Sequence, residues 1–152
     1  MDFVRIEGPG PALEEARAFL REYWTSFGFT PCFQGFDAEL AALPGEYAPP
    51  RGLLLLAPGA GCVAVRPLEG GMAEMKRLYV RPQARGSGLG RSLALAAVAH
   101  GRELGFTRLV LDTMPAQMAE AVALYRSMGF LPAAAYLVPP TPGALCMELR
   151  LR

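Results

Sequence analysis

The chain has 152 residues, a formal net charge of +1 and a hydrophobic content of 52%. This length suits one domain with a proper core and is too short for two ordinary domains, so we expect a single domain over residues 1–152. A net charge this close to zero argues against the broad basic surface of nucleic-acid-binding proteins, and we expect no nucleic-acid partner.

The cysteines and the apolar segments indicate the cellular compartment in which the protein is expected. The three cysteines are isolated from one another and lack the spacing of metal ligands, so we expect reduced thiols and no metal site. No apolar run at the N-terminus resembles a signal peptide, and the run at residues 53–56 is far too short to span a bilayer. The sequence therefore predicts a cytoplasmic protein with no membrane partner.

The N-terminal segment predicts a short strand and one amphipathic helix. The strand covers residues 3–6, and the helix begins at Pro11, a residue favoured in the first turn of helices. Gly28 ends this helix. Apolar residues at steps of three and four give it one buried stripe. The stripe consists of Leu13, Ala16, Leu20, Tyr23 and Phe27.

The next segment predicts a short helix followed by an antiparallel meander of three strands. We expect Asp37 to cap the helix, which runs to about residue 43. Strands at residues 53–57 and 62–66 are separated by a Pro-Gly-Ala-Gly turn. A second turn leads into a strand at residues 73–80, around which the rest of the chain is organised.

A glycine-rich loop joins that strand to a helix expected over residues 89–104. The loop glycines are Gly86, Gly88 and Gly90. Glycines let the backbone approach a ligand closely and turn its N–H groups toward it. The first turn of the helix offers unpaired N–H groups and a partial positive charge, a combination that binds phosphate. Arg85 and Arg91 flank the loop and add full positive charges.

Two other nucleotide-binding loops can be compared with this one. A P-loop ends in Gly-Lys-Ser/Thr, whereas Gly90 is followed here by Arg91 and Ser92. A dinucleotide-binding loop follows the first strand of a βαβ unit and has an acidic residue about 20 positions later. Glu103 and Asp112 fall in that range, but the loop lies mid-chain after an antiparallel meander, which argues against that class.

The C-terminal part predicts strands interrupted by one helix. A strand at residues 108–112 should run parallel to the strand at residues 73–80, because a helix connects the two. Pro115 is expected to open the next helix. The apolar stripe of that helix consists of Ala121, Leu124, Tyr125 and Met128. Residues 136–138 and 145–151 are predicted to form a final strand pair.

Two motifs and the order of the elements resemble the GNAT superfamily of N-acetyltransferases. The first motif is Val80-x-Pro82 followed by a Gln/Arg-x-x-Gly-x-Gly/Ala loop, which residues 83–88 and residues 85–90 both satisfy. The second is Leu-Tyr-x-x-x-Gly-Phe at residues 124–130. The resemblance covers essentially the whole chain. It implies an α+β fold with a mixed, mostly antiparallel sheet that splays open near its middle and is flanked by about four helices.

The resemblance also implies that acetyl-CoA is the co-substrate and lies in the opening of the sheet. The pyrophosphate would bind the N–H groups of residues 85–90, and the pantetheine arm would pair with the central strand as an added strand. The implied CoA-binding residues are Leu78, Tyr79, Val80, Arg85, Gly86, Ser87, Gly88, Leu89, Gly90, Arg91 and Ser92. The family often has Asn at the position of Met118.

Glu74 and Tyr125 are the candidate catalytic residues. Many family members carry a carboxylate where this chain has Glu74, which would accept the proton of the acceptor amine. The alternative is an ion pair of Glu74 with Lys76 or Arg77. Tyr125 matches the family's tyrosine near the CoA sulfur and would protonate the departing thiolate, or else it is a core tyrosine. A strand N–H near Leu78 would hold the oxyanion, and a bulge in this strand, common in the family, would alter which side chains share a face.

We therefore expect an N-acetyltransferase that moves an acetyl (acyl) group from acetyl-CoA directly to a primary amine in a ternary complex. A small-molecule amine is the first choice of acceptor, because the net charge is near zero and the N-terminal segment is apolar and aromatic. A protein or peptide amine is the alternative acceptor, and a non-catalytic acyl-CoA-binding module is the alternative function. Because dimers are common in the family, a homodimer is a further expectation.

Overall fold

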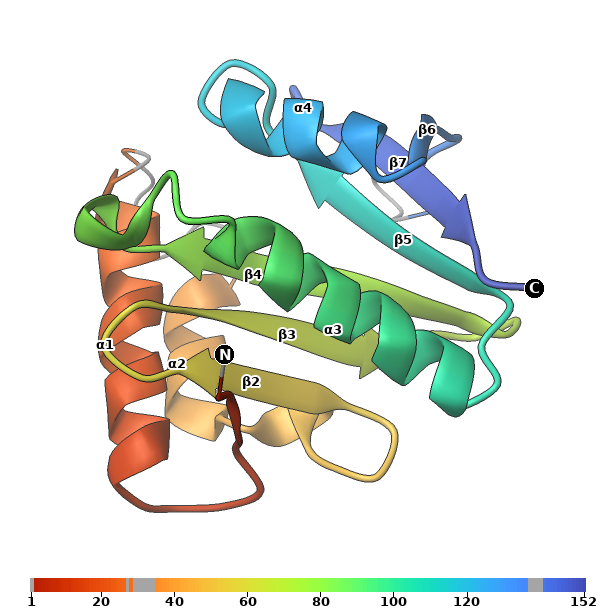
Figure 1. The fold of residues 1–152 in the computed structure, drawn as a ribbon. Coiled ribbons are helices and arrows are strands. Elements are labelled where there is room, and N and C mark those ends of the chain that lie inside the picture. The colour runs from red at the N-terminus through yellow and green to blue at the C-terminus, as the bar shows by residue number, and fades with distance from the viewer. Residues whose placement is uncertain (1, 27, 29–34, 137–140) are drawn as a thin grey trace.

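The computed structural model describes residues 2–26, 28, 35–136 and 141–152, and these residues form one seven-stranded sheet with four α-helices (Figure 1). The helices are α1 (Pro11–Ser26), α2 (Phe36–Ala42), α3 (Leu89–Glu103) and α4 (Ala119–Ser127), with the 3-10 turns η2 (Gly45–Tyr47) and η3 (Pro82–Ala84). The strands are β1 (Val4–Arg5), β2 (Leu53–Ala57), β3 (Gly61–Pro67), β4 (Met72–Val80), β5 (Arg108–Thr113), β6 (Leu131–Pro132) and β7 (Leu145–Arg150).

The strand directions agree with the sequence-based prediction. The strands are ordered β1-β2-β3-β4-β5-β7-β6, and β1 to β4 pair antiparallel with one another in succession. β5 runs parallel to β4, and the connection between them contains α3. β7 pairs antiparallel with both β5 and β6. The expected mixed, mostly antiparallel sheet is therefore confirmed.

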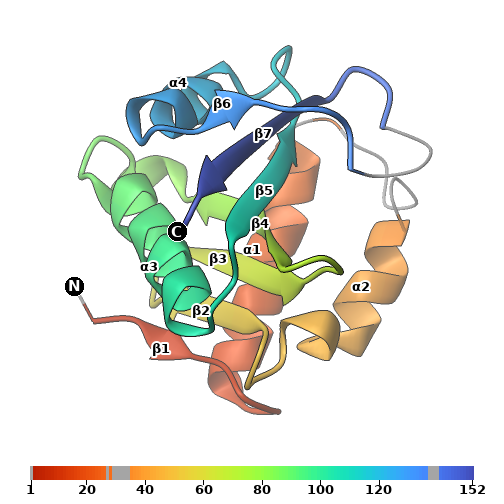
Figure 2. The same ribbon diagram turned by 90° about the vertical axis from the view of Figure 1, so that its right-hand side faces the viewer.

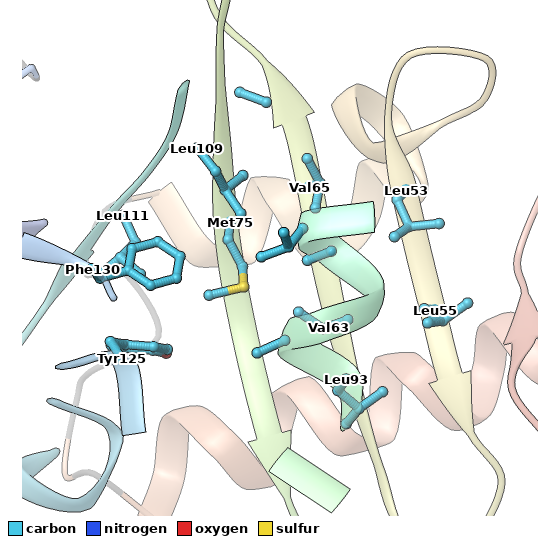
Figure 3. Close-up of a cluster of buried hydrophobic side chains, with 14 of the residues drawn as sticks. Leu53, Leu55, Val63, Val65, Met75, Leu93, Leu109, Leu111, Tyr125 and Phe130 are labelled. Carbon is cyan, nitrogen blue, oxygen red and sulfur yellow. The ribbon is translucent and has the colours of Figure 1, made fainter. Parts of the chain in front are cut away.

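The sheet carries a hydrophobic core on each of its two faces. Figure 2 shows α3 on one side of the strands β2 to β4 and α1 with α2 on the other. Along β2, Leu53 and Leu55 belong to the core under α3 and α4, which Figure 3 shows, whereas Leu54 and Leu56 belong to the core under α1 and α2. Because both faces of β2 are covered, its sequence is a continuous apolar run instead of an alternating one.

β4 and β5 separate soon after they meet. Their parallel pairing covers three residue pairs and ends at Glu74 and Val110. β4 continues along β3 to Val80, and β5 continues along β7 to Thr113. The two strands therefore diverge, as Figure 1 shows, and within the described sheet no strand covers the β5-facing edge of β4 over residues 75–80.

A bulge interrupts β4 where it passes α2. Two β4 residues, 77 and 78, lie opposite the single β3 residue Val63. Arg77 has a φ of 59°, a left-handed conformation that is rare for residues other than glycine. The bulge resets the alternation of side chains, so that Tyr79 packs in the core under α1 while Leu78 and Val80 pack on the side of α3.

The Arg77 side chain fastens this bulge to α2. Its Nε and Nη2 atoms donate to the two carboxylate oxygens of Glu39 at 2.8 and 2.7 Å, and its guanidinium lies 4.7 Å from the centroid of the Trp24 ring. Burial acts to raise the pKa of Glu39, but the hydrogen bonds and charge of Arg77 outweigh it and hold that pKa below its usual value. Arg77 and Glu39 therefore form a largely buried ion pair.

Arg77→Met should lower the free energy of unfolding by about 3 kcal/mol or more, because the largely buried Glu39 carboxylate loses its cation. The matched control is Arg81→Met. Arg81 pairs with Glu22 through side chains that are 32% and 39% exposed, and such pairs contribute less than about 1 kcal/mol. Urea denaturation of both variants measures the two losses. Equal losses would contradict the view that Arg77 anchors the bulge.

The start of α2 differs from the prediction. α2 begins at Phe36 with Gly35 as its N-cap, so Asp37 lies inside the first turn and the expected Asp37 cap is wrong. Phe36 is buried, and its ring stacks on Trp24 with the centroids 4.1 Å apart. That packing explains why the helix includes Phe36, a contact between distant segments that the local sequence does not reveal.

The start of α4 also differs from the prediction. The helix begins at Ala119, not at Pro115. The N–H groups of Gln117 and Met118 both donate to the carbonyl of Met114, at 3.0 and 2.8 Å, so the segment after Pro115 forms a separate turn. Met118 has φ −129° and ψ 42°, which is outside the helical region and fixes the helix start after it.

The predicted final strand pair is only half correct. β7 is present, but Tyr136 is not in a strand, because its hydroxyl reaches across to the Glu74 carboxylate instead. The remainder of that predicted strand, residues 137–138, lies outside the described residues, as do Phe27 and Cys32. Of the described cysteines, Cys62 and Cys146 are free thiols. No helix in the described part of the chain has the length and apolarity needed to cross a membrane.

Candidate active site

The loop between β4 and α3 turns on two glycines. Gly86 and Gly88 both have a φ of 82°, in the left-handed region that L side chains rarely adopt. A Cβ atom at either position would meet no other atom within 4 Å, so the backbone conformation and not crowding requires glycine. Gly90 differs, because a Cβ atom there would lie 3.6 Å from Leu124 of α4 and 3.7 Å from Val80.

The loop presents a row of backbone N–H groups toward the N-terminus of α3. Within the described residues, the N–H groups of residues 86–91 donate to no other group, and the first bond into the helix runs from Ser92 to the Gly88 carbonyl. Gly88 is the N-cap and has no side chain that could accept from these donors. Free N–H groups at the N-terminus of a helix are suited to binding a phosphate group.

A cavity of about 600 Å³ adjoins this loop and extends between β4 and α4. Nine of the predicted CoA-binding residues line it, namely Leu78, Tyr79, Val80, Arg85, Gly86, Gly88, Leu89, Gly90 and Arg91. The other two, Ser87 and Ser92, do not line the cavity and brace the loop, because their hydroxyls donate to the carbonyls of Ala84 and Gly88. From the side of α4, Met118 contributes a thioether where the family often has an amide.

Two arginines fix the ends of the loop. Arg85 Nε donates to the Val80 carbonyl at 3.1 Å, and Arg91 Nη2 donates to the Ser127 hydroxyl at 2.6 Å. Each of these bonds uses one of the five N–H donors of a guanidinium, so both side chains keep donors for an anion. The positive charges therefore stand on either side of the free N–H groups, as the sequence predicts.

A second cavity, of about 480 Å³, lies on the side of the sheet that α2 covers. α2, η2, β3 and β4 contribute to it, and its lining includes Glu39, Glu46, Tyr47, Arg66 and Lys76. Cavities of this size hold small molecules in many proteins. Arg66 of β3, which lines the cavity, is paired with Glu74 of β4, and Glu74 is the last β4 residue that pairs with β5. This cavity therefore lies beside the point where β4 and β5 diverge.

Glu74 lies at that point and is fully buried, with 0% of the residue exposed. Its Oε1 accepts from Arg66 Nε at 2.5 Å, and its Oε2 accepts from the Tyr136 hydroxyl at 2.5 Å. Arg66 also donates to Glu46 at 2.7 Å. Glu74 is therefore ion-paired with Arg66, not with Lys76 or Arg77, the two partners considered from the sequence.

Asp112 is a second carboxylate at this point that sequence reasoning did not select for the site. It follows Val110, the β5 residue opposite Glu74, by two positions, so both carboxylates lie on the same face of the sheet. Burial raises the pKa of Asp112 above its usual value, and the nearby Glu74 charge raises it further. One signal in the sequence could have identified it, namely a single acidic residue at the end of an apolar strand.

Tyr136 and Arg66 were also missed, because each becomes part of the site only through tertiary contacts with Glu74. Burial raises the pKa of Tyr136 above its usual value, and the Glu74 charge raises it further. The Tyr136 hydroxyl therefore stays protonated and acts as a donor at neutral pH. Tyr136 is partly exposed, whereas the Glu74 carboxylate to which it donates is fully buried.

Tyr125 projects from α4 toward β4 (Figure 3). Its ring packs against Phe130 with centroids 5.7 Å apart, and the residue is 7% exposed. Burial raises the pKa of its hydroxyl, which therefore stays protonated at neutral pH. The hydroxyl makes no hydrogen bond to any other group in the described part of the chain. These observations are compatible with both alternatives, a proton donor and a core tyrosine.

The histidine and the acidic residues give no sign of a metal centre in the described part of the chain. His100, the chain's one histidine, is buried, and its Nε2 lies 2.8 Å from the Arg51 carbonyl, so it ties α3 to the segment before β2. Among the residues described, no group of three or more His, Cys, Asp and Glu side chains could hold a metal ion.

Sequence comparison relates the chain to acetyltransferases over most of its length. A sequence model of the acetyltransferase (GNAT) family matches residues 16–130. An uncharacterized N-acetyltransferase from Schizosaccharomyces pombe is 39% identical over 145 residues, which cover 91% of this chain and 88% of that relative.

Comparison with solved structures gives the same fold. An acetyltransferase of the GNAT family from Staphylococcus aureus aligns with a TM-score of 0.82 at 18% identity, covering 99% of this chain and 100% of that one. An aminoglycoside 6'-N-acetyltransferase complexed with coenzyme A aligns with a TM-score of 0.72 at 14% identity, covering 100% and 98% of the two chains. At these identities the alignments establish a shared architecture.

Proposed function

Because this chain belongs to the acetyltransferase (GNAT) family, whose members are acyl-CoA-dependent N-acyltransferases, we propose that it acetylates a primary amine of a small molecule. The observation that carries the proposal is the combination of a phosphate-binding loop, an uncovered strand edge and a separate cavity beside two carboxylates. The first two features suit acetyl-CoA, and the third suits an amine.

In this proposal the backbone of the opening binds acetyl-CoA. The free N–H groups of residues 86–91, with Arg85 and Arg91, bind the pyrophosphate. The edge of β4 at residues 78–80 pairs with the amide groups of the pantetheine arm, because no strand covers it there. The N–H of Leu78, which follows the left-handed Arg77, is the donor that would stabilise the negative charge of the thioester oxygen during transfer.

The proton of the acceptor amine is taken up through Tyr136 and Glu74. Glu74 has no exposed surface, so it cannot meet the amine directly. The Tyr136 oxygen has free lone pairs, and it can accept the amine proton while its own proton moves to Glu74 Oε2, 2.5 Å away. The neutral amine then attacks the thioester carbon, an N–C bond forms and the C–S bond breaks. The nitrogen loses a second proton as the amide forms, and this proton balances the one that Tyr125 gives to the departing sulfur. Arg66 holds Glu74 in place for this relay.

Tyr125 supplies the proton that the departing sulfur requires. Tyr125→Phe should lower kcat about 10- to 100-fold while the affinity for acetyl-CoA and the free energy of unfolding stay nearly unchanged, because the change removes only a hydroxyl that bonds to no described group. Steady-state kinetics, calorimetry and denaturation together check this expectation. An unaltered kcat would identify Tyr125 as a core residue with no role in proton transfer.

The described cysteines support direct transfer over an acyl-enzyme intermediate. Cys62 is fully buried, which raises the pKa of its thiol to about 12, and burial also raises the pKa of Cys146. Thiols of this kind are poor nucleophiles at neutral pH. Transfer within a ternary complex then requires that acetyl-CoA and the amine occupy the two cavities at the same time.

The volume of the second cavity favours a small acceptor over a peptide. About 480 Å³ is enough for a compact amine, whereas a peptide chain needs an extended groove. Release of CoA thiol, measured over a panel of small amines and of peptides with free N-termini or lysines, tests this assignment. Turnover of small amines is expected. If only peptides were acetylated, the function would be protein or peptide acetylation. If CoA bound but no amine was acetylated, the protein would be a non-catalytic acyl-CoA-binding module.

A further inference from the structure

Lys76 is the one lysine of the chain, and among the described residues it is the charged group lining the second cavity that contacts no counterion. Its half-buried side chain lines the cavity from β4. Within residues 2–26, 28, 35–136 and 141–152, its ammonium group forms no hydrogen bond and no ion pair. An ammonium group that is partly removed from water is stabilised by an ionic partner.

The other charged residues around this cavity are already satisfied. Glu39 is held by the two hydrogen bonds from Arg77. Arg66 lies between Glu46 and Glu74 and donates to both. Lys76 is therefore left as a positive charge that points into a space large enough for a small molecule.

The surroundings of Lys76 disfavour its charged form when no anion is bound. Burial lowers the pKa of Lys76, and the neighbouring Arg77 and Arg66 guanidiniums lower it further, while Glu74 and Glu39 act in the opposite direction. An anion bound to the ammonium group compensates for the hydration that this group has lost through burial. The binding of an anionic group here is thus favoured by the site itself.

We propose that the acceptor of this acetyltransferase is an amino acid, whose carboxylate binds the Lys76 ammonium while its amine lies toward Glu74, Tyr136 and Asp112. The inference rests on the proposed function and names the substrate class of the same site. Lys76 and Glu74 are two positions apart on β4, before the bulge, so both side chains lie on the same face of the sheet. Lys76 lines the cavity, whereas Glu74 is buried beside it, so the carboxylate of a zwitterion meets Lys76 and its amine reaches Glu74 only through the Tyr136 hydroxyl.

The charge balance of the cavity selects a carboxylate over a phosphate or phosphonate. Of the two cations that line the cavity, Arg66 contacts two carboxylates, and Lys76 is the one that no described carboxylate contacts, which matches the single charge of a carboxylate ligand. Glu39 and Glu46 also line the cavity, and they would repel a second negative charge.

The first test compares each amino acid with its own amide, which keeps the amine and side chain and removes the carboxylate charge. The wild-type enzyme should acetylate acids with a kcat/KM at least about 30-fold above that of the amides, the equivalent of one hydrogen bond between charged groups. Lys76→Met should abolish this preference by raising KM for the acids. Lys76→Arg, which keeps the charge, should retain most of it. Amides used as well as acids, or an unchanged preference in Lys76→Met, would overturn the inference.

The second test does not depend on turnover. Because the chain has one lysine, protein labelled with ¹³C-lysine gives a single side-chain ε-CH₂ resonance. With CoA bound, addition of amino acids should shift this resonance saturably, and the amides should not shift it. Absence of any shift with every amino acid would refute the inference, and so would a larger response to aminoalkylphosphonates.

The two tests separate this inference from the function on which it rests. Failure of wild-type protein to bind acetyl-CoA by calorimetry would refute the proposed function itself. Acetyl-CoA binding and amine turnover without any preference for a carboxylate would refute only the assignment of Lys76.

Discussion

Gly88→Val abolishes acetyl-CoA binding, weakening it by at least about 100-fold, while the domain remains folded. Gly88 has a φ of 82°, and a β-branched residue cannot hold this conformation without a cost of roughly 1–2 kcal/mol or more. The loop relaxes to a different conformation, and the N–H groups of residues 86–91 no longer converge. Loss of two or three hydrogen bonds to a charged group accounts for this magnitude.

The matched control is Gly70→Val. Gly70 has a φ of 73° and, like Gly88, has no atom within 4 Å of an added Cβ, but it lies in the turn between β3 and β4, at the end of the sheet opposite the loop. Both variants therefore carry a similar backbone strain, and only one of them alters the loop. Isothermal calorimetry should show wild-type affinity for Gly70→Val, and equal affinities in the two variants would refute the role of the loop.

Glu74→Gln should lower kcat by about 10²- to 10⁴-fold and leave the affinity for acetyl-CoA unchanged. The amide is isosteric with the carboxylate and can still accept the hydrogen bond from Tyr136, but it cannot accept a proton. Tyr136→Phe breaks the same relay from the other side and should give a loss of similar size. Because the two residues act in sequence, the double variant should be hardly slower than either single variant.

Glu148→Gln is the control for the loss of a carboxylate. Glu148 is on β7 and pairs with Arg108 at 3.0 Å, so it resembles Glu74 in type of partner, and Val110 of β5 stands between it and Glu74 in the sheet. Its substitution should leave kcat within about twofold of the wild type, as expected for a partly exposed pair. If Glu74→Gln and Tyr136→Phe retained full activity, the proton relay would have to be replaced by one through Asp112.

The glycine loop and the central strands were predictable because their signals are local. Gly86 and Gly88 adopt the positive φ values that glycine permits, and α3 begins at Leu89, where the sequence places it. The order of the meander and the parallel β5 follow from turn residues and from the helical connection. Nine of eleven predicted CoA-binding residues line the larger cavity for the same reason, because they are consecutive or nearly so in the chain.

The partners of Glu74 were not predictable because they come from distant segments. Arg66 is eight residues away on β3, and Tyr136 is 62 residues away and leaves its predicted strand to reach the carboxylate. Nothing in the local sequence distinguishes Arg66 from the other arginines of the chain. The stacking of Phe36 on Trp24, which shifts the start of α2, is likewise a contact between segments.

The bulge at Arg77 was predictable only in part. The resemblance to the family indicates that a bulge is common in this strand, but only the structure places Arg77 at φ 59° and pairs it with Glu39. This detail determines which β4 side chains share a face. It leaves Lys76 in the second cavity and turns Leu78 toward α3, which is the arrangement on which the proposed acceptor site depends.

A crystal structure of the protein with acetyl-CoA tests most directly whether the opening between β4 and β5 is the acyl-CoA site. We expect the diphosphate oxygens within hydrogen-bond distance of the N–H groups of residues 86–91, and the pantetheine arm along β4 at residues 78–80. Crystals grown at saturating acetyl-CoA in which the ligand binds elsewhere, or in which β4 and β5 close on each other, would contradict the account.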